Sequence, residues 1–353
     1  MKRIITLISV CSMLATACDY NTVPQLGNAI YGSSELIPVS LHLMGVTTKA
    51  LESSSMEKQI KDLQVFVYTV DSEGNKAYDS YYSFGAGDGN RTIYIDKNSD
   101  AVSYWVAAYA NHPKITAREI LEDWSLLSNE STDNFQMVGA GGETVENLIK
   151  VNTLQIELVR QCSKVSVKEI EIAWTNTANK HKTFKLKGMY LMDVPGVLKN
   201  HFDLSSDIAN NQALWQNKNG YYPSSLDNLL YDSIDDVTVS EDTPYTTGHI
   251  FYGYINPSLT YNSTSSWAPG GTRLVIEAEF DGEPCYYAVA LNKVDGVTVF
   301  DDLRNKHIEF SKITITRPGA SAPYEALPDE SPVTVSVSVQ PWQPGFSGDY
   351  TIQ

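Results

Sequence analysis

The sequence has little basic charge for its length, which argues against a nucleic-acid partner. Its 353 residues include 26 Lys and Arg against 42 Asp and Glu, which leaves a formal net charge of -16. Nucleic-acid binding depends on Lys and Arg for phosphate contacts and counterion release, and no stretch of the chain gathers them into a basic patch. The acidic balance instead favours solubility and repulsion between free monomers.

Metal-binding and catalytic signatures are also missing from the sequence. Only Cys162 and Cys285 lie beyond the first twenty residues, and neither belongs to a CxxC pair or a Cys/His cluster, so we predict no metal site. None of the six histidines stands in an HExxH motif, and no serine lies in a GxSxG elbow. We therefore predict no enzymatic activity and no cofactor. For the two cysteines, a disulfide and two buried free thiols both remain open.

Two patterns are similar to ligand sites but have simpler interpretations. Asp232, Asp235 and Asp236 lack the glycine and glutamate spacing of a calcium-binding EF-hand loop, so we interpret them as the solvated end of a helix. A group of aromatic residues offers flat faces on which sugar rings stack, although alternating aromatics are more typical of a strand in a core. The group consists of Phe251, Tyr252, Tyr254 and Trp267.

The first twenty residues predict export from the cytoplasm. Lys2 and Arg3 precede an apolar run from Ile4 to Ala17 that is short for a membrane span, and small residues lead into Cys18. This order is similar to a bacterial lipoprotein box. We therefore expect residues 1–18 to be a lipoprotein signal peptide with an acylated Cys18, and plain signal-peptide cleavage is the alternative. No later stretch is long and apolar enough to span a bilayer.

Two segments near opposite ends of the chain share one alternating pattern. The C-terminal segment carries a valine at every second position, at Val333, Val335, Val337 and Val339. The N-terminal segment repeats the spacing with Ile37, Val39, Leu41 and Leu43. This alternation predicts strands with one buried face, and Pro332 and Pro341 limit the C-terminal strand at both ends. The valine face must be buried either in its own domain or in a groove on another copy of the chain.

The rest of the chain predicts an all-β protein. With 21 Tyr and 6 Trp, the composition suits an ordered protein rich in strands. Strands recur from Leu63 to Thr316, with turn signals such as Asp281-Gly282 between them. The length favours two domains, and we place their boundary near Arg160 to Ser163.

One helix is also predicted. Thr116 and Glu119 form a capping box, and Ile120, Trp124 and Leu127 follow at helical spacing.

Several motifs follow one another along the chain in a recognisable order. After Cys18 and Lys49 come Phe135–Gly139, Leu158–Val165, Tyr190–Pro195, Phe251–Asn256, Thr272–Ile276 and Arg304–Ile315. Their order resembles that of the Bacteroidales fimbrillins, the major subunits of type V pili, over nearly the whole chain. Each motif alone is loose, so the order carries the weight. The chain departs from the family pattern at Lys49, where many members have Arg, and at Cys162, where a small residue such as Ala is common.

The resemblance implies two tandem transthyretin-like β-sandwich domains, at residues 50–162 and 163–353, and assembly by donor-strand exchange. In that scheme a trypsin-like protease cuts an outer-membrane lipoprotein precursor after a basic residue, here between Lys49 and Ala50. Residues 19–49 then leave as a leader that contains the first strand, and the C-terminal strand of another subunit fills the open groove. The displaced strand carries Ile37, Val39, Leu41 and Leu43. The donor strand, within 333–353, carries Val333, Val335, Val337, Val339 and Trp342.

These observations predict a structural subunit of a cell-surface fimbria, of the stalk rather than the tip, that supports adhesion. The implied partners are other copies of the chain and accessory fimbrial subunits, the maturation protease, the outer membrane through the lipid of the precursor, and a host glycan or protein. One alternative is a tip or accessory fimbrial subunit. The other is a monomeric surface lipoprotein that binds glycans through exposed aromatics such as Trp267 or Trp342.

Overall fold

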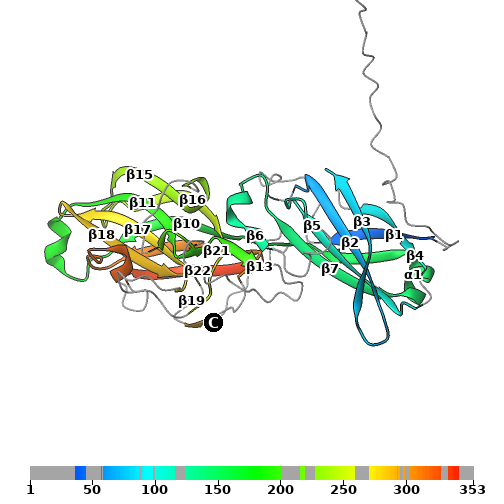
Figure 1. The fold of residues 1–353 in the computed structure, drawn as a ribbon. Coiled ribbons are helices and arrows are strands. Elements are labelled where there is room, and N and C mark those ends of the chain that lie inside the picture. The colour runs from blue at the N-terminus through cyan, green and yellow to red at the C-terminus, as the bar shows by residue number, and fades with distance from the viewer. Residues whose placement is uncertain are drawn as a thin grey trace, which may run out of the picture. The chain divides into compact units, whose positions relative to one another are not determined.

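The computed structural model describes residues 36–44, 57, 59–86, 90–97, 100–115, 124–199, 215–218, 227–258, 270–291, 293–294, 297–298, 303–326 and 333–341. These residues belong to one compact unit. They form two β-sandwiches with only short helices, which confirms the predicted all-β sandwich fold (Figure 1).

The first sandwich pairs a five-stranded sheet with a three-stranded sheet. The larger sheet has the order β3 (Lys76–Gly85), β2 (Asp62–Val70), β5 (Ser103–Ala110), β7 (Met137–Thr144) and β9 (Val159–Arg160). The smaller has the order β4 (Asn90–Asp96), β1 (Leu36–Met44) and β8 (Thr153–Glu157). Both sheets contribute to one buried apolar cluster, so the core lies between them.

A short helix, α1 (Val145–Val151), connects β7 to β8. The Thr144 side chain caps its start by accepting a hydrogen bond from the Asn147 N–H, and Asn152 ends it in the left-handed conformation. This helix was not predicted from the sequence, although its capping residues are favourable ones.

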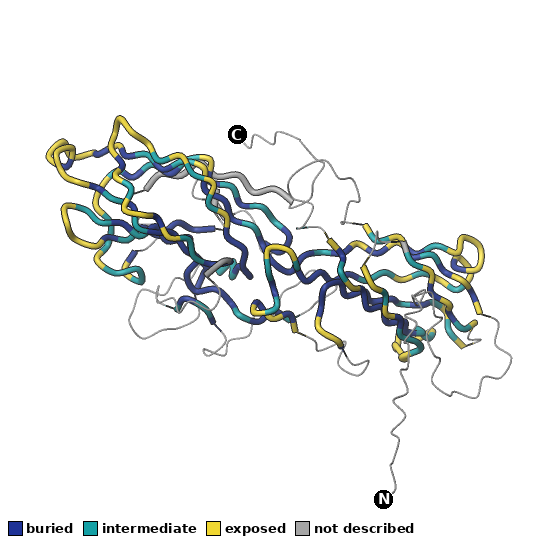
Figure 2. The backbone as a smooth tube through the Cα atoms, turned by 90° about the horizontal axis from the view of Figure 1, so that it is seen from above, coloured by how far each residue is buried: buried dark blue, intermediate teal, exposed yellow. Residues whose placement is uncertain are grey.

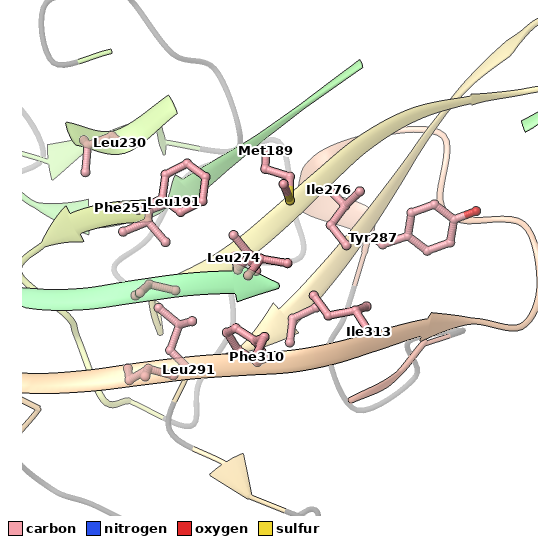
Figure 3. Close-up of a cluster of buried hydrophobic side chains, with 14 of the residues drawn as sticks. Met189, Leu191, Leu230, Phe251, Leu274, Ile276, Tyr287, Leu291, Phe310 and Ile313 are labelled. Carbon is pink, nitrogen blue, oxygen red and sulfur yellow. The ribbon is translucent and has the colours of Figure 1, made fainter. Parts of the chain in front are cut away.

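The second sandwich is built from two four-stranded sheets. One has the order β16 (Tyr245–Gly253), β10 (Ser163–Ile172), β21 (Lys306–Ile315) and β22 (Val333–Pro341). The other has the order β15 (Tyr231–Thr238), β11 (Phe184–Met192), β17 (Arg273–Phe280) and β18 (Glu283–Ala290). Figure 3 shows side chains from both sheets meeting in its core, among them Met189, Leu274, Phe251, Phe310 and Ile313.

Three two-stranded ribbons and five short helical segments complete the described secondary structure. The ribbons are β12 (Val194–Pro195) with β14 (Trp215–Gln216), β13 (Val197–Lys199) with β6 (Trp124–Leu126), and β19 (Lys293–Val294) with β20 (Val297–Thr298). The helical segments are α1, α2 (Asp227–Leu230) and the 3-10 turns Leu127–Asn129, Thr177–His181 and Pro323–Glu325.

Burial alternates along many of the strands, as Figure 2 shows in the changes between dark and light segments. The turn predicted at Asp281-Gly282 joins β17 to β18, and both residues have positive φ, of 57° and 90°. Such angles are typical of the two-residue hairpin turns that match strand twist.

Two local predictions are wrong. Trp124, which we expected in a helix, lies in strand β6 and pairs with Lys199 of β13, while Thr116, Glu119 and Ile120 lie outside the described residues. The acidic residues expected at a helix end, Asp232, Asp235 and Asp236, lie in strand β15. In both cases pairing with a distant strand decides the local conformation.

Candidate functional site

Strand β1 lies in the middle of the smaller sheet of the first sandwich. It pairs antiparallel with β4, where Val39 stands opposite Ile93, and parallel with β8, where Leu41 stands opposite Leu154. Both neighbours, β4 and β8, come later in the chain, and β1 lies between them and links them into one sheet. If β1 were removed, both neighbours would have an open edge.

The one-sided pattern expected for this segment matches its burial. Ile37 is 6% exposed, Val39 and Leu41 are 0% exposed, and Leu43 is partly buried against the same cluster. Between them, Leu36, Pro38 and His42 are exposed and Ser40 is half-buried. The core around the inward-facing side chains includes Ile93, Ile95, Leu154, Ile156, Val65 and Val106. The cluster into which β1 packs is therefore largely aliphatic, with Tyr82 and Tyr104 as its buried aromatic members.

Glycines in β7 allow β8 to approach the opposite sheet closely. Cβ atoms on Gly139 and Gly141 would collide with the backbone carbonyl oxygens of Glu157 and Gln155. Because a glycine has no Cβ, Gly139 lets β8, one wall of the β1 slot, lie close to β7. Gly139 is also the last residue of the motif Phe135–Gly139, which is part of the family resemblance.

The segment that connects β1 to β2 is flanked by Met44 and Glu57, and each of these residues is hydrogen-bonded to the stretch Leu158–Arg160. The Leu158 N–H donates a 2.9 Å hydrogen bond to the Met44 carbonyl oxygen. Two residues later, Arg160 Nε donates a 3.0 Å hydrogen bond to the Glu57 carbonyl oxygen. The predicted cleavage residues, Lys49 and Ala50, fall between these two points and lie outside the described residues, as does Cys18.

The predicted donor segment forms β22, an edge strand that pairs antiparallel with β21 of the same chain. Its valines stand opposite buried residues of β21: Val333 opposite Ile315, Val335 opposite Ile313, Val337 opposite Phe310 and Val339 opposite Ile308. Trp342 lies outside the described residues. Among the described strands β22 pairs with β21 alone, so its removal would break fewer of the described backbone hydrogen bonds than removal of a central strand.

The two cysteines are free thiols and both are buried. Cys162 lies in a polar cluster where the family-like motifs meet. There Glu130, only 5% exposed, accepts hydrogen bonds from Tyr254 OH at 2.8 Å and from the Gln136 backbone N–H at 2.8 Å. Burial raises the pKa of Glu130 to about 8 despite these hydrogen bonds. Burial, together with the nearby Glu130, also raises the pKa of the Cys162 thiol.

A second buried polar pair joins β17 to the bend after β11. Arg273 and Asp193 are both 0% exposed, and Arg273 Nη2 donates a 3.1 Å hydrogen bond to Asp193 Oδ2. Arg273 Nη1 also donates to the Ala326 carbonyl oxygen at 3.0 Å. Asp193 adopts the left-handed conformation, with a φ of 56°. Both residues fall in motifs that carry the family resemblance, Tyr190–Pro195 and Thr272–Ile276, but nothing in the sequence indicates that they pair.

The other candidate ligand groups have partners within the protein. Asp232 pairs with Nδ1 of His249, and Asp236 lies 2.7 Å from Lys187 Nζ. Among the described residues, no group of three or more His, Cys, Asp or Glu is placed to hold a metal ion. No helix within the described ranges is long and apolar enough to cross a membrane.

The aromatic residues weighed as a sugar platform are core residues where the structure describes them, which is the interpretation that their alternation favoured. Phe251, Tyr252 and Tyr254 are 1%, 6% and 1% exposed. Trp267 lies outside the described residues.

Comparison with known proteins finds the same fold in solved structures of low sequence identity. No protein-family model matches the chain, and no curated protein sequence matches it. Solved structures do match. A fimbrilin from Porphyromonas gingivalis W83 is similar with a TM-score of 0.60 and 16% identity, over 87% of this chain and 97% of its own.

Two further structures share the fold and are provisionally assigned to cell adhesion. The first, from Parabacteroides distasonis ATCC 8503, has a TM-score of 0.57 and 14% identity over 88% of this chain and 98% of its own. The second, from Bacteroides eggerthii DSM 20697, has a TM-score of 0.56 and 18% identity over 90% of this chain and 98% of its own. The predicted resemblance to fimbrillins is therefore confirmed at the level of the fold.

Proposed function

We propose that the chain is a structural subunit of a cell-surface fimbria, in the stalk, and that it polymerises when the donor strand of one copy replaces β1 of the next. The precursor is exported as a lipoprotein acylated at Cys18, and a trypsin-like protease cuts it between Lys49 and Ala50. The mature subunit then has two domains, 50–162 and 163–353. The observation that carries the proposal is the matched alternation of a central strand, β1, and an edge strand, β22, in a fold shared with a fimbrilin.

The number of neighbouring strands favours the exchange. In its own sheet β22 forms one ladder, with β21, whereas the β1 slot offers two, with β4 and β8. A strand that moves from the edge to the slot therefore gains a second set of backbone hydrogen bonds, each worth about 1 kcal/mol. Main-chain pairing of this kind supplies the affinity in strand addition, and alternate side chains supply the fit.

Side-chain volume explains why a cut is needed first. Ile37, Leu41 and Leu43 each carry one methylene more than the valines that would replace them. At about 0.8 kcal/mol for each buried methylene, β1 fills the slot better than the donor strand by roughly 2 kcal/mol. While β1 remains covalently attached, it also competes at a high effective concentration. The intact precursor therefore stays closed, and the cut lets β1 leave.

The geometry around the cleavage segment suits a cut that leaves the fold in place. Met44 and Glu57 are bonded to Leu158 and Arg160, which stand two residues, or about 7 Å, apart along an extended chain. The proposed cut between Lys49 and Ala50 lies in the segment between Met44 and Glu57. Cutting it breaks none of the described contacts at either end.

The proposal is tested by treating the purified precursor with trypsin and examining it for fibres by electron microscopy. We expect fibres from the cut wild-type protein and none from a chain that lacks Val333–Gln353. A matched pair of point variants sharpens the test: Val337→Asp should abolish fibres, whereas Ser336→Asp, which falls on the other face of the alternating pattern, should permit them. Fibres of normal length from the truncated chain would contradict the proposal.

Labelling of native fimbriae separates the stalk from a tip or accessory position. Antibodies to the chain should bind along the whole shaft, whereas labelling of one end only would favour a tip subunit. A monomeric glycan-binding protein would bind a glycan array without being cut, whereas we expect little binding from a stalk subunit.

A further inference from the structure

We propose that Glu57 is the anchor that holds the new N-terminal segment of the mature chain to the second sandwich once β1 has been released. The inference rests on the proposed function for the cut at Lys49. Its own basis is a cluster of contacts in which Glu57 meets Arg160 of the first sandwich and Lys164 and Tyr252 of the second.

The side chain of Glu57 is held by two residues of neighbouring strands. Glu57 Oε1 accepts hydrogen bonds from Tyr252 OH at 2.6 Å and from Lys164 Nζ at 2.8 Å. Lys164 of β10 stands opposite Tyr252 of β16 in the ladder, so the two donors are fixed side by side. The side chains of Glu57 and Lys164 are only 12% and 14% exposed, so solvent and salt screen this ion pair less than a pair on the open surface.

The backbone of Glu57 is held by a third partner. Arg160 is 1% exposed, and its Nε donates a 3.0 Å hydrogen bond to the Glu57 carbonyl oxygen, while its Nη1 donates to Asn305 Oδ1 at 3.0 Å. Burial lowers the pKa of Arg160 to about 10, and the negative charge of Glu57 acts against this shift. The Glu57 carbonyl oxygen thus accepts a hydrogen bond from the buried Arg160 guanidinium, and the Glu57 carboxylate places a compensating negative charge near that guanidinium.

The position of Glu57 in the chain gives these contacts their role. It follows Ala50 by seven residues, and it is the first described residue after the proposed cut. In the precursor the same segment is also restrained from the other side, because Met44 is bonded to Leu158. After the cut, Glu57 is the first described contact that opposes fraying toward Ile60, which is buried in the core, and toward the start of β2. The next is Gln59, whose carbonyl oxygen accepts a 2.7 Å hydrogen bond from Asn111 Nδ2. The anchor should therefore matter more in the cut chain than in the intact one.

The test measures hydrogen exchange, by mass spectrometry, in the full-length precursor with a recognition site for a specific protease across residues 47–50. Peptides covering residues 57–70 are followed before and after cutting, at a dilution that keeps the protein monomeric. We expect Glu57→Gln to speed hydrogen exchange in these peptides relative to the wild type, and this increase should be about tenfold larger in the cut chain than in the intact one. Tenfold is the factor expected for loss of hydrogen bonds to a charged group. Tyr252→Phe removes one of these bonds and should give a smaller effect in the same direction.

The control is Glu146→Gln, which removes the carboxylate of an exposed ion pair with Lys150 on α1 and should change neither form. An equal effect of Glu57→Gln before and after the cut would overturn the inference, because Glu57 would then be a general stabilising residue. No effect in either form would overturn it as well. Fibre formation is scored separately on concentrated portions of the same preparations. If no fibres form but hydrogen exchange follows the predicted pattern, strand exchange fails and the role of Glu57 as an anchor still holds.

Discussion

Gly139 lies so close to Glu157 that a Cβ atom on the glycine would stand 2.1 Å from the Glu157 carbonyl oxygen. Gly139 belongs to the backbone of β7, which pairs with β5, and Glu157 to that of β8, which pairs with β1. Neither backbone can therefore move aside at low cost. The contact joins β7 to β8, and β8 is one wall of the slot that holds β1. A single hydrogen atom in place of a side chain thus brings this wall close to the opposite sheet.

Gly139→Ala should therefore destabilise the first sandwich by about 3 kcal/mol, at the upper end of the usual cost of overpacking. Gly85→Ala is the matched control, because a Cβ atom there meets no heavy atom within 4 Å. Urea unfolding monitored by circular dichroism measures both variants. Equal stabilities for the two would show that β7 and β8 do not need this close approach.

Asp193→Asn should destabilise the second sandwich by roughly 3 kcal/mol or more, because it leaves the buried guanidinium of Arg273 without its negative partner. Asparagine also tolerates the left-handed conformation of this position, so the substitution tests charge rather than backbone strain.

Asp281→Asn is the control for this prediction. Asp281 has nearly the same φ, 57°, but its partner Lys182 lies 3.4 Å away at an exposed site. We expect a loss of under about 1 kcal/mol there. A similar loss at both positions in denaturant titrations would contradict the assigned role of the buried pair.

Glu130 should make stability fall as the pH rises. In the unfolded chain the pKa of its carboxyl is near the ordinary value of 4.5, whereas burial raises the pKa in the folded protein to about 8. The contribution of the protonated side chain is therefore fully present below about pH 4.5 and is lost as the pH rises toward 8.

Glu130→Gln carries a neutral side chain at every pH and should flatten this dependence. The measurement is the free energy of unfolding at pH 5 and pH 8 in the wild type and the variant, with the exposed-site variant Glu146→Gln as control. Parallel pH profiles for wild type and Glu130→Gln would show that Glu130 is not held protonated in the fold.

The mature protein in native fimbriae should begin at Ala50. N-terminal sequencing of purified fibres measures this directly. Lys49→Arg should preserve the cut, and Lys49→Ala should leave the leader attached and prevent assembly, since β1 then stays in its slot. Fimbriae whose subunits begin with an acylated Cys18 would contradict the proposed maturation.

The strands were predictable because their patterns are local. Strands were expected to recur from Leu63 to Thr316, and β11 (Phe184–Met192) and β17 (Arg273–Phe280) are two of those that the structure shows in this range. The alternation at Ile37–Leu43 likewise corresponds to the burial of β1. Period-two hydrophobicity is encoded in neighbouring residues, so it can be found without knowing the partner strand.

The helix prediction failed where a distant partner decides the structure. Trp124–Leu126 has helical spacing to preceding residues, yet it pairs with Val197–Lys199, more than seventy positions later. A ladder with another strand outweighs a weak local propensity, and a single sequence does not reveal the partner.

The buried polar contacts were missed for the same reason. Glu57 meets Tyr252 across 195 positions, and Glu130 meets Tyr254 across 124. No spacing rule connects residues so far apart. The sole local sign was that Cys162, Tyr252 and Tyr254 fall in motifs shared with the fimbrillins, which marked the region without assigning roles to its side chains.

The most direct test of strand exchange is a structure of the assembled fibre, determined by electron cryomicroscopy at a resolution that identifies side chains. The decisive observation is the identity of the strand between β4 and β8. We predict that it is Val333–Pro341 of a neighbouring subunit, with its valines on the face that Ile37, Val39, Leu41 and Leu43 occupy in the precursor. If Leu36–Met44 of the same chain still lies there, the central claim is wrong.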